Sequence, residues 1–278
     1  MGIASNYQSK FWNGVGLQSL FTLVAIVLSI IFAFTGSIAA AEKVVPFHPG
    51  EKLVFEVKWQ FIPAGEAILE VLPLETINGV EHYHFVMTAK TYKYIDPLYK
   101  VRDRIDAYTD LEMTYSKLYE QKNRGKRKKN IVLNFDPERQ KVQYSKNGKK
   151  KKPISILSGS FDPLSVFYAF RFFDLKENTV LEVPVTDGKK CVIGHAKVIR
   201  RETVRIESGT YDTYLVEPDL KHIGGVFKKS KNAKFRIWVT ADARRIPVKM
   251  ESEVIVGSFV GELISAEGIG GDAIALKR

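Results

Sequence analysis

The histidines are the first candidates for chemistry in this sequence. Five are present, and His82 and His84 stand two residues apart in a segment of alternating polar and apolar residues. Residues i and i+2 of a strand face the same side, so this pair could ligate a metal ion edge-on. A third ligand is not visible, and His-x-His is also an ordinary solvated strand surface. We predict no metal and no cofactor.

Three carboxylates are the next candidates, here for general acid–base catalysis. Asp103, Asp106 and Asp110 are close in the sequence, but strand alternation turns Asp103 away from Asp106. The sequence also lacks a phosphate loop, a Gly-x-Ser-x-Gly elbow and a His-Glu-x-x-His pair. The sequence therefore predicts no catalytic residues, although it does not rule out an enzyme.

The single cysteine, Cys191, excludes an intramolecular disulfide. A nucleophilic thiol needs a nearby base and positive charge, and Lys190 and His195 offer only a weak version of both. We interpret Cys191 as an inert thiol on a strand.

Basic side chains give a stronger pattern, because they gather at predicted turns in three groups. Each Lys or Arg near an anionic membrane surface contributes about 1 kcal/mol of attraction, so turns that share one edge would form an anion-binding rim. Solvated hairpin tips are the alternative. The residues predicted to meet an anionic surface are Lys126, Arg127, Lys128, Lys129, Lys149, Lys150, Lys151, Lys228 and Lys229.

Strands must position most of these residues, because period-2 alternation dominates from Glu51 onward. Turn signals such as Asn78-Gly79 and Asn147-Gly148 recur between the alternating runs. This spacing indicates an antiparallel meander and not alternating βαβ units. We predict a mainly β fold: a curved antiparallel sheet of the half-barrel or β-clam kind, with one short apolar helix packed on it.

The predicted helix is the one segment that breaks the β pattern. Asp162 suits the N-cap and Pro163 the first helical position. The stripe Leu164, Phe167 and Tyr168 has helical spacing. This helix, over residues 162–173, could be mobile and plug the concave face of the sheet, or it could close an ordinary core.

The first 41 residues read as a secretory signal peptide. Lys10 precedes an apolar run, Leu17 to Phe34, and Ala39-Ala40-Ala41 offers small residues for cleavage before Glu42. The alternative is an uncleaved membrane anchor, because about 18 mostly apolar residues nearly span a bilayer. Either alternative places the domain outside the cytoplasm, and we expect a periplasmic location.

The exported part is basic. Without residues 1–41, whose one charged side chain is Lys10, the chain keeps 41 of its 42 Lys and Arg against 31 Asp and Glu, a net charge of +10. This charge favours polyanionic surroundings, and export argues against nucleic acid, so we expect no nucleic-acid partner. We expect one β-rich domain over residues 42–267 and a flexible tail over 268–278.

Four motifs carry a resemblance to a known family. They are Phe47–Leu53, Asp162–Tyr168, Gly209–Tyr214 and Ile237–Val248. Together they resemble an exported bacterial family, domain-of-unknown-function family 3108, which has no assigned activity and so implies no catalytic residues. The last motif is also similar to lipoprotein-carrier half-barrels of the LolA/LolB kind, a likeness that implies a curved sheet around an apolar cavity. The lysine-rich segments 122–129 and 146–152 depart from a typical member.

Three functions follow from these observations. We favour a non-enzymatic binding or carrier-like protein of the envelope, holding a lipid or another apolar or anionic ligand, with a membrane surface as a further partner. The alternatives are a structural or interaction protein with a packed core, whose protein partner the sequence does not name, and an enzyme acting on envelope glycans or lipids. The side chains expected on the ligand-binding face are Phe55, Val57, Trp59, Tyr83, Phe85, Phe167, Tyr168 and Trp238.

Overall fold

The alternating segments form one long antiparallel meander. The computed structural model describes residues 45–126, 128–219, 234–254 and 257–270, all of which belong to the second of the two units into which contacts divide the chain. The strands are β1 Lys52–Trp59, β2 Ile62–Ile77, β3 Val80–Thr91, β4 Arg102–Thr109, β5 Ser116–Arg124, β6 Lys128–Asp136, β7 Lys141–Lys146, β8 Lys149–Lys150, β9 Ile154–Ser155, β10 Val180–Thr186, β11 Cys191–Ile206, β12 Gly209–Pro218, β13 Lys234–Thr240, β14 Pro247–Val254 and β15 Gly257–Glu267. The helices are α2 Ser165–Ala169 and the 3₁₀ turn η1 Phe170–Phe172.

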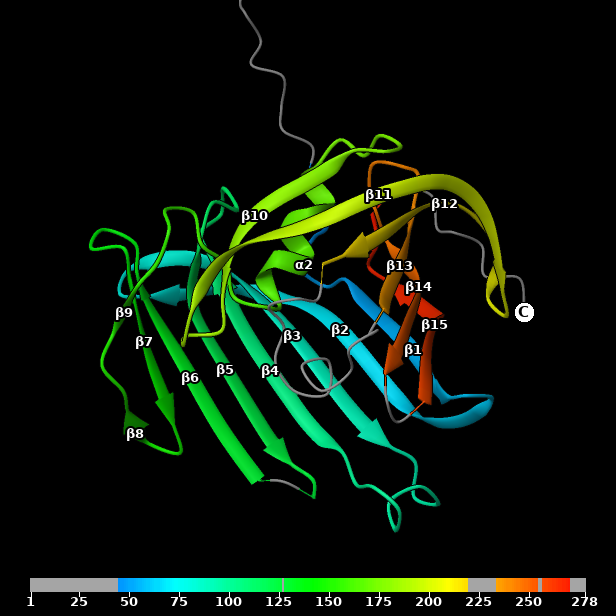
Figure 1. Cartoon of the computed structure of the whole chain (residues 1–278), viewed down its shortest axis with the longest axis horizontal. Helices are drawn as coiled ribbons and strands as arrows, with labels where there is room; N and C mark the ends of the chain where they lie inside the picture. Colours follow the sequence, from blue (N-terminus) through cyan, green and yellow to red (C-terminus); the bar gives the residue numbers. More distant parts are fainter. Residues whose placement is uncertain (1–44, 127, 220–233, 255–256, 271–278) are drawn as a thin grey trace, which may run out of the picture. The chain divides into compact units, whose positions relative to one another are not determined.

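Hydrogen bonding joins all these strands into one sheet. The strand order is β10-β11-β12-β13-β14-β15-β1-β2-β3-β4-β5-β6-β7-β8, with β9 paired to β7. Within the described residues β10 and β8 end this order without pairing to each other, so the sheet curves but does not close into a barrel (Figure 1). The predicted fold class is confirmed.

The predicted Asn-Gly turns set the register of two hairpins. Asn78 and Gly79 have φ angles of 53° and 81°, and Asn147 and Gly148 have 49° and 80°. Two consecutive left-handed residues make a type I′ turn, whose twist matches that of the flanking strands. The strands on either side of each turn pair directly, as in Ile77 with Val80 and Lys146 with Lys149.

The short helix lies on the concave side of the sheet, where it contacts β4 and stacks on Phe85 of β3 (Figure 1). Asp162 fixes its first turn, because its side chain accepts hydrogen bonds of 2.8 and 2.9 Å from the backbone of Leu164 and Ser165. The α-helix proper begins at Ser165 and not at Pro163, and it ends in a 3₁₀ turn. The two residues after Asp162 thus form a capping turn in place of the first helical turn that we predicted.

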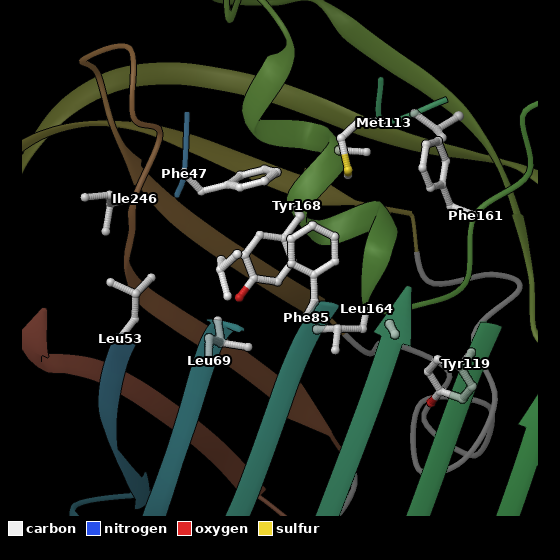
Figure 2. Close-up of a cluster of buried hydrophobic side chains, with 14 of the residues drawn as sticks. Phe47, Leu53, Leu69, Phe85, Met113, Tyr119, Phe161, Leu164, Tyr168 and Ile246 are labelled. Carbon is white, nitrogen blue, oxygen red and sulfur yellow. The ribbon is translucent and has the colours of Figure 1, made fainter. Parts of the chain in front are cut away.

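A single large apolar cluster fills the space between helix and sheet. Odd-numbered residues of β3, β4, β5 and β6 are cross-strand neighbours on the concave face, as in the row Phe85, Ala107, Tyr119 and Leu133. Each of these four side chains is buried. Figure 2 shows Tyr168 reaching from the helix into this layer beside Phe85 and Phe47.

Several sequence predictions lie outside the described residues. They are the signal peptide over 1–41 with its cleavage before Glu42, the side chains of Arg127, Lys228 and Lys229, and most of the predicted tail. Within the described ranges, no helix has the length and apolar character needed to cross a membrane.

Candidate functional site

The helix is held in place by aromatic packing. The Tyr168 ring stacks on Phe85 with centroids 4.0 Å apart and planes at 13°, and Phe47 meets both rings edge-on. Burial raises the pKa of Tyr168 far above its usual value. Phe55 is also fully buried in this cluster, while Tyr83 and Phe167 are partly buried against it. These predicted ligand-binding residues form core and not an open binding face.

A buried ion pair fixes the end of the same helix. Arg171 donates to both carboxylate oxygens of Glu51, at 2.5 and 2.9 Å, and to the carbonyls of Pro46 and Arg244, at 2.6 and 2.8 Å. Both charged side chains are almost completely buried. We predicted that the helix could be mobile, but these interactions make it a fixed part of the core.

An apolar groove runs along one side of the fixed helix. It has a volume of about 230 Å³ and lies between α2 and the hairpin β10–β11. Val166 and Phe170 line it from the helix side, Val183 and Val185 from β10, and Ile193 from β11. We call it the α2–β11 groove. Lys190 and His195 add polar groups to its lining.

A second pocket of about 220 Å³ lies where β4, β5 and β6 end, and its character is polar and basic. We call it the Lys129 pocket. Its charged lining residues are Lys100, Lys126, Lys129 and Asp103, and its other lining residues are Tyr99, Val101, Asn123 and Gly125.

Strand register explains how the Lys129 pocket is assembled. Asp103 pairs with Asn123, and Asn123 pairs with Lys129, so the three side chains form a cross-strand row. These residues have the same parity as Ala107, Tyr119 and Leu133, which places the row on the concave face. The backbone N–H of Lys126 donates to the Lys100 carbonyl at 2.9 Å and joins the β3–β4 loop to the β5–β6 turn.

The surroundings of Lys129 disfavour its charged form. Burial lowers its pKa, and the nearby positive charges of Lys189 and Lys146 lower it further. Burial also raises the pKa of Asp103, which moves the only carboxyl among the pocket's lining residues toward its neutral form. The Asn123 side-chain oxygen is buried and accepts no hydrogen bond from the described residues. Such perturbed and unsatisfied groups are typical of binding sites.

Two of the predicted lysine groups converge here. Asn147, in the β7–β8 turn, donates from its backbone to the Asn130 carbonyl and accepts from the Asn130 N–H through its side chain, both at 2.8 Å. The β5–β6 and β7–β8 turns therefore lie side by side at one edge of the sheet. Lys126, Lys128, Lys149, Lys150 and Lys151 are exposed at this edge, and Lys129 is half-buried.

The β10–β11 turn lines the α2–β11 groove and also packs against β6, the strand that carries Lys129. Its residues Asp187 and Lys190 line the α2–β11 groove. Its Lys189 lies over the Tyr144 ring at 5.5 Å and contributes to the lowered pKa of Lys129. Gly188 permits this approach, because a Cβ there would lie 2.3 Å from the Leu133 side chain.

Trp238 is buried in the same apolar cluster as Phe55, and its ring also makes polar contacts. Ile237 and Val239 line a small pocket with Phe167 and Phe170, so strand alternation turns Trp238 to the other face of β13. There its indole N–H donates to Glu202 at 2.9 Å and the Lys249 ammonium lies 5.0 Å from its ring. Val57 and Trp59 lie on β1 and are only half-buried.

The polar candidates for catalysis point in different directions. His84 bonds to Asp106 at 3.0 Å, with Arg104 on the same carboxylate, whereas His82 bonds to the Val80 carbonyl. Asp110 accepts from the backbone of Thr114 and Tyr115 in the β4–β5 turn. Among the described residues, no group of three or more His, Cys, Asp and Glu side chains is arranged to hold a metal ion.

Comparison with known proteins shows the family of this chain. A family model described as "Protein of unknown function (DUF3108)" matches residues 54–264. The chain belongs to this family. No curated protein matches it. The DUF3108 description states no activity, so it assigns no role to either pocket.

Two solved structures are similar to this DUF3108 chain. A β-barrel-like protein of family DUF1849 from Brucella abortus has a TM-score of 0.49 at 10% identity, covering 80% of this chain and 98% of its own. A candidate lipoprotein from Parabacteroides distasonis has a TM-score of 0.35 at 11% identity, covering 81% and 99%. Both are similarities of shape at low sequence identity.

Sequence reasoning missed part of the lysine pocket in this DUF3108 member. Tyr99, Lys100 and Asn123 were not singled out, and Asp103 was considered only as a catalytic acid. A usable signal was present, because alternate turns of an antiparallel meander fall at the same edge of the sheet. That rule places the segment around Lys100 beside the lysine-rich β5–β6 turn.

Proposed function

We propose that this chain is an exported, non-enzymatic binding protein that holds an anionic amphiphile on the concave side of its sheet. The observation that carries the proposal is the position of the β10–β11 turn, which lines the apolar α2–β11 groove and places Lys189 beside the basic Lys129 pocket. Residues 1–41 supply the export signal in this proposal. A lipid or lipid-like molecule has both chemical halves that such an arrangement favours.

The Lys129 pocket suits the charged head group. Lys100, Lys126 and Lys129 offer ammonium groups to a phosphate or carboxylate. A bound anion would relieve the repulsion that Lys129 experiences from Lys146 and Lys189. The buried oxygen of Asn123 would accept a hydrogen bond from a hydroxyl or ammonium group on the same head group.

The α2–β11 groove suits an apolar chain. Valine, isoleucine, phenylalanine and proline side chains make up most of its lining. Its volume of about 230 Å³ lies below the range of about 300–1,000 Å³ typical of pockets for drug-sized ligands. The groove would therefore hold part of a tail. The ligand would lie along the fixed helix and not beneath it.

Fluorescence displacement tests the proposal. The probe is a dansyl-labelled fatty acid, which combines a carboxylate with an apolar chain, and phosphatidylglycerol serves as competitor. We expect wild-type protein to bind the probe and release it to the competitor. The double variant K126Q/K129Q should weaken binding about tenfold or more, because each lost charged hydrogen bond is worth about 1.5–3 kcal/mol. Ile193→Asp should weaken it by placing a carboxylate in the groove.

Two matched controls separate the site from general effects. Lys176→Gln removes an exposed lysine that is paired with Asp174 and lines neither pocket. Val180→Asp adds a carboxylate at an exposed β10 residue that does not line the groove. Both should bind like the wild type. Equal binding by all five proteins, or no lipid in native mass spectra of protein purified from its host, would contradict the proposal.

The packed interior favours a second candidate, an interaction protein of the envelope. Tyr168, Phe47 and Phe85 leave the layer beneath the helix filled, as expected of a protein whose surface and not its interior carries the function. A wild-type protein that binds no amphiphile but co-purifies stoichiometrically with another envelope protein would support this candidate instead.

A further inference from the structure

Four connections of the meander meet at one end of the sheet. In an antiparallel meander successive turns alternate between the two ends, so the β1–β2, β3–β4, β5–β6 and β7–β8 connections share one. Hydrogen bonds confirm two of the contacts between them. The Tyr94 hydroxyl donates to the Pro63 carbonyl at 2.5 Å, and Lys126 N–H donates to the Lys100 carbonyl at 2.9 Å. We call these connections the lysine end.

Large apolar side chains are exposed at the lysine end. Phe61, at the tip of the β1–β2 turn, is 95% exposed, and the adjacent Ile62 is 52% exposed. In the neighbouring β3–β4 loop Leu98 is 66% exposed and Tyr94 is 61% exposed. A Phe side chain loses about 1.5–3 kcal/mol of burial free energy when it is left in water. A cluster of such residues therefore marks an interaction surface.

Positive charge surrounds these apolar side chains. Lys93 and Lys100 lie in the same loop as Leu98, and Lys126 lies in the next turn with its ammonium 5.7 Å from the Tyr99 ring. Lys128 and Lys149 continue the charge along the adjacent turns, and all five lysines are exposed. Asp96, which is held by Arg102 at 2.7 Å, is the one acidic residue of the β3–β4 loop.

The opposite end of the sheet has a different charge. Its β4–β5 connection carries Asp110 and Glu112, and Glu81 follows the β2–β3 turn at the start of β3. No Lys or Arg lies between Ile77 and Val80 or between Thr109 and Ser116. The β6–β7 turn there mixes both signs, with Asp136 paired to Arg139. The basic charge is thus concentrated at the end where Phe61, Ile62 and Leu98 are exposed, and it is not a general property of the hairpin tips.

We infer that the lysine end docks on an anionic membrane surface, with Phe61, Ile62 and Leu98 entering the interfacial layer and the lysines meeting the phosphates. Apolar insertion combined with electrostatic attraction is how peripheral proteins bind such surfaces. Tyr94 and Tyr99 suit the boundary, because each has an apolar ring and a polar hydroxyl. A protein partner would have to match both features, whereas an anionic bilayer supplies them at any point on its surface.

Docking on the membrane does not require the proposed ligand, but it would affect how that ligand reaches the Lys129 pocket. The Lys129 pocket opens among residues of the same end, since Tyr99, Lys100 and Lys126 line it. A docked protein would therefore present this pocket to the head groups. Failure of docking and failure of ligand binding remain distinguishable, because the first is read on vesicles and the second with a soluble probe.

Vesicle flotation with the full chain tests the inference. The vesicles are pure phosphatidylcholine or phosphatidylcholine mixed with phosphatidylglycerol, at physiological ionic strength. Every variant keeps the same residues 1–41, so their contribution cancels between variants. We expect Phe61→Ser to lower the partition coefficient on mixed vesicles about tenfold. Lys93→Gln and Lys128→Gln should each lower it about fivefold, and only on vesicles that contain phosphatidylglycerol.

Val80→Ser is the matched control. Val80 is 59% exposed, but it lies in the β2–β3 turn at the opposite end, so its partition coefficient should equal that of the wild type. Phe61→Trp supplies a direct readout, because its emission should shift to the blue on mixed vesicles while that of Val80→Trp should not. The inference is overturned if Val80→Ser and Phe61→Ser behave alike, or if neither tryptophan responds to vesicles. If the Phe61→Ser variant binds the dansyl probe and releases it to phosphatidylglycerol as the wild type does, the variant is folded.

Discussion

Arg171 and Glu51 meet as a two-point ion pair inside the core, although 120 residues separate them in the sequence. A charge left alone in such a place is poorly solvated, so breaking a buried pair costs about 3–5 kcal/mol. We predict that Arg171→Met lowers the free energy of unfolding by that amount in urea denaturation.

Two further variants show whether the loss comes from the orphaned carboxylate. The double variant R171M/E51L should recover most of the stability, because replacing both charges with apolar groups is often close to neutral. Arg201→Met removes an ion pair with Asp212 that solvent screens, so this change should cost far less than Arg171→Met. Equal losses of unfolding free energy in the single and double variants would show that Arg171 stabilises the fold mainly through the hydrogen bonds that its guanidinium donates to the carbonyls of Pro46 and Arg244.

Substitution of Lys129 is expected to increase stability, in contrast to substitution of Arg171. Because burial and the neighbouring lysines lower the pKa of Lys129, its charged form destabilises the folded state. Lys129→Gln should therefore raise the free energy of unfolding by about 0.5 kcal/mol, the low end for surface-charge changes, because solvent screens this half-buried charge and Asp103 offsets part of the repulsion. The same change should weaken binding of the dansyl probe. Thermal denaturation checks the first effect and displacement checks the second.

The pH dependence of this gain follows from the sign of the shift. At neutral pH the lysine is protonated in both states and its penalty in the folded state is fully present. As pH rises toward the ordinary lysine value of 10.5, the folded protein loses this proton first and the penalty disappears. The stability difference between Lys129→Gln and the wild type should therefore shrink on going from pH 7 to about pH 10. Lys128→Gln, at an exposed neighbour, should show no such gain.

Local pattern was enough to predict the strands, and the reason is physical. Segments such as Phe55–Trp59 alternate strictly, and Asn78-Gly79 adopts the left-handed angles of a tight turn without strain. What pattern could not supply was which face of a strand becomes core. Ile237 and Val239 line a small pocket beside the helix, while Trp238 between them is buried in the same apolar cluster as Phe55, so both faces of β13 are covered.

The lysine pocket was predictable only in part. Charge clustering pointed to Lys126, Lys128 and Lys129, but nothing in their own segment shows that Lys100 lies beside them. That contact depends on the register of β4 with β5, which is set by pairings such as Asp103 with Asn123. The sequence likewise could not show that the helix is held in place, because the ion pair that holds it joins Arg171 to the distant Glu51 at the start of the domain.

The lowered pKa of Asp106 predicts how the free energy of unfolding falls at low pH. Burial alone would raise its pKa, but hydrogen bonds from His84 and Arg104 outweigh burial and hold the pKa of Asp106 well below 3.8. This carboxylate stays ionised in the folded protein at a pH where the unfolded chain protonates it. Its stabilising contribution is therefore complete above about pH 5 and is lost as pH falls through and below about 4.

The variant Asp106→Asn measures that contribution. Its stability should fall less steeply than that of the wild type between pH 5 and pH 2.5, with a change in the difference of at least about 1.4 kcal/mol, the equivalent of one pKa unit. Asp212→Asn is the control, because Asp212 pairs with Arg201 at an exposed position, where solvent screens the interaction. Parallel acid limbs for the wild type and Asp106→Asn would contradict the assignment.

Gly125 connects the stability of the lysine end with its pocket. A Cβ at this position would lie 2.1 Å from the Lys100 carbonyl oxygen, a backbone atom that cannot turn aside. Gly125→Ala must therefore push the β3–β4 loop away and break the hydrogen bond from Lys126 N–H to that carbonyl, which is 2.9 Å long. We expect a loss of about 1–3 kcal/mol in unfolding free energy, as in other overpacked sites, together with weaker binding of the dansyl probe.

Gly261→Ala is the matched control, because its nearest new contact would be the Met250 side chain at 3.7 Å, an ordinary packing distance. If the two variants proved equally stable, the loop would be free to move, and the pocket would not need the close contact between Gly125 and Lys100.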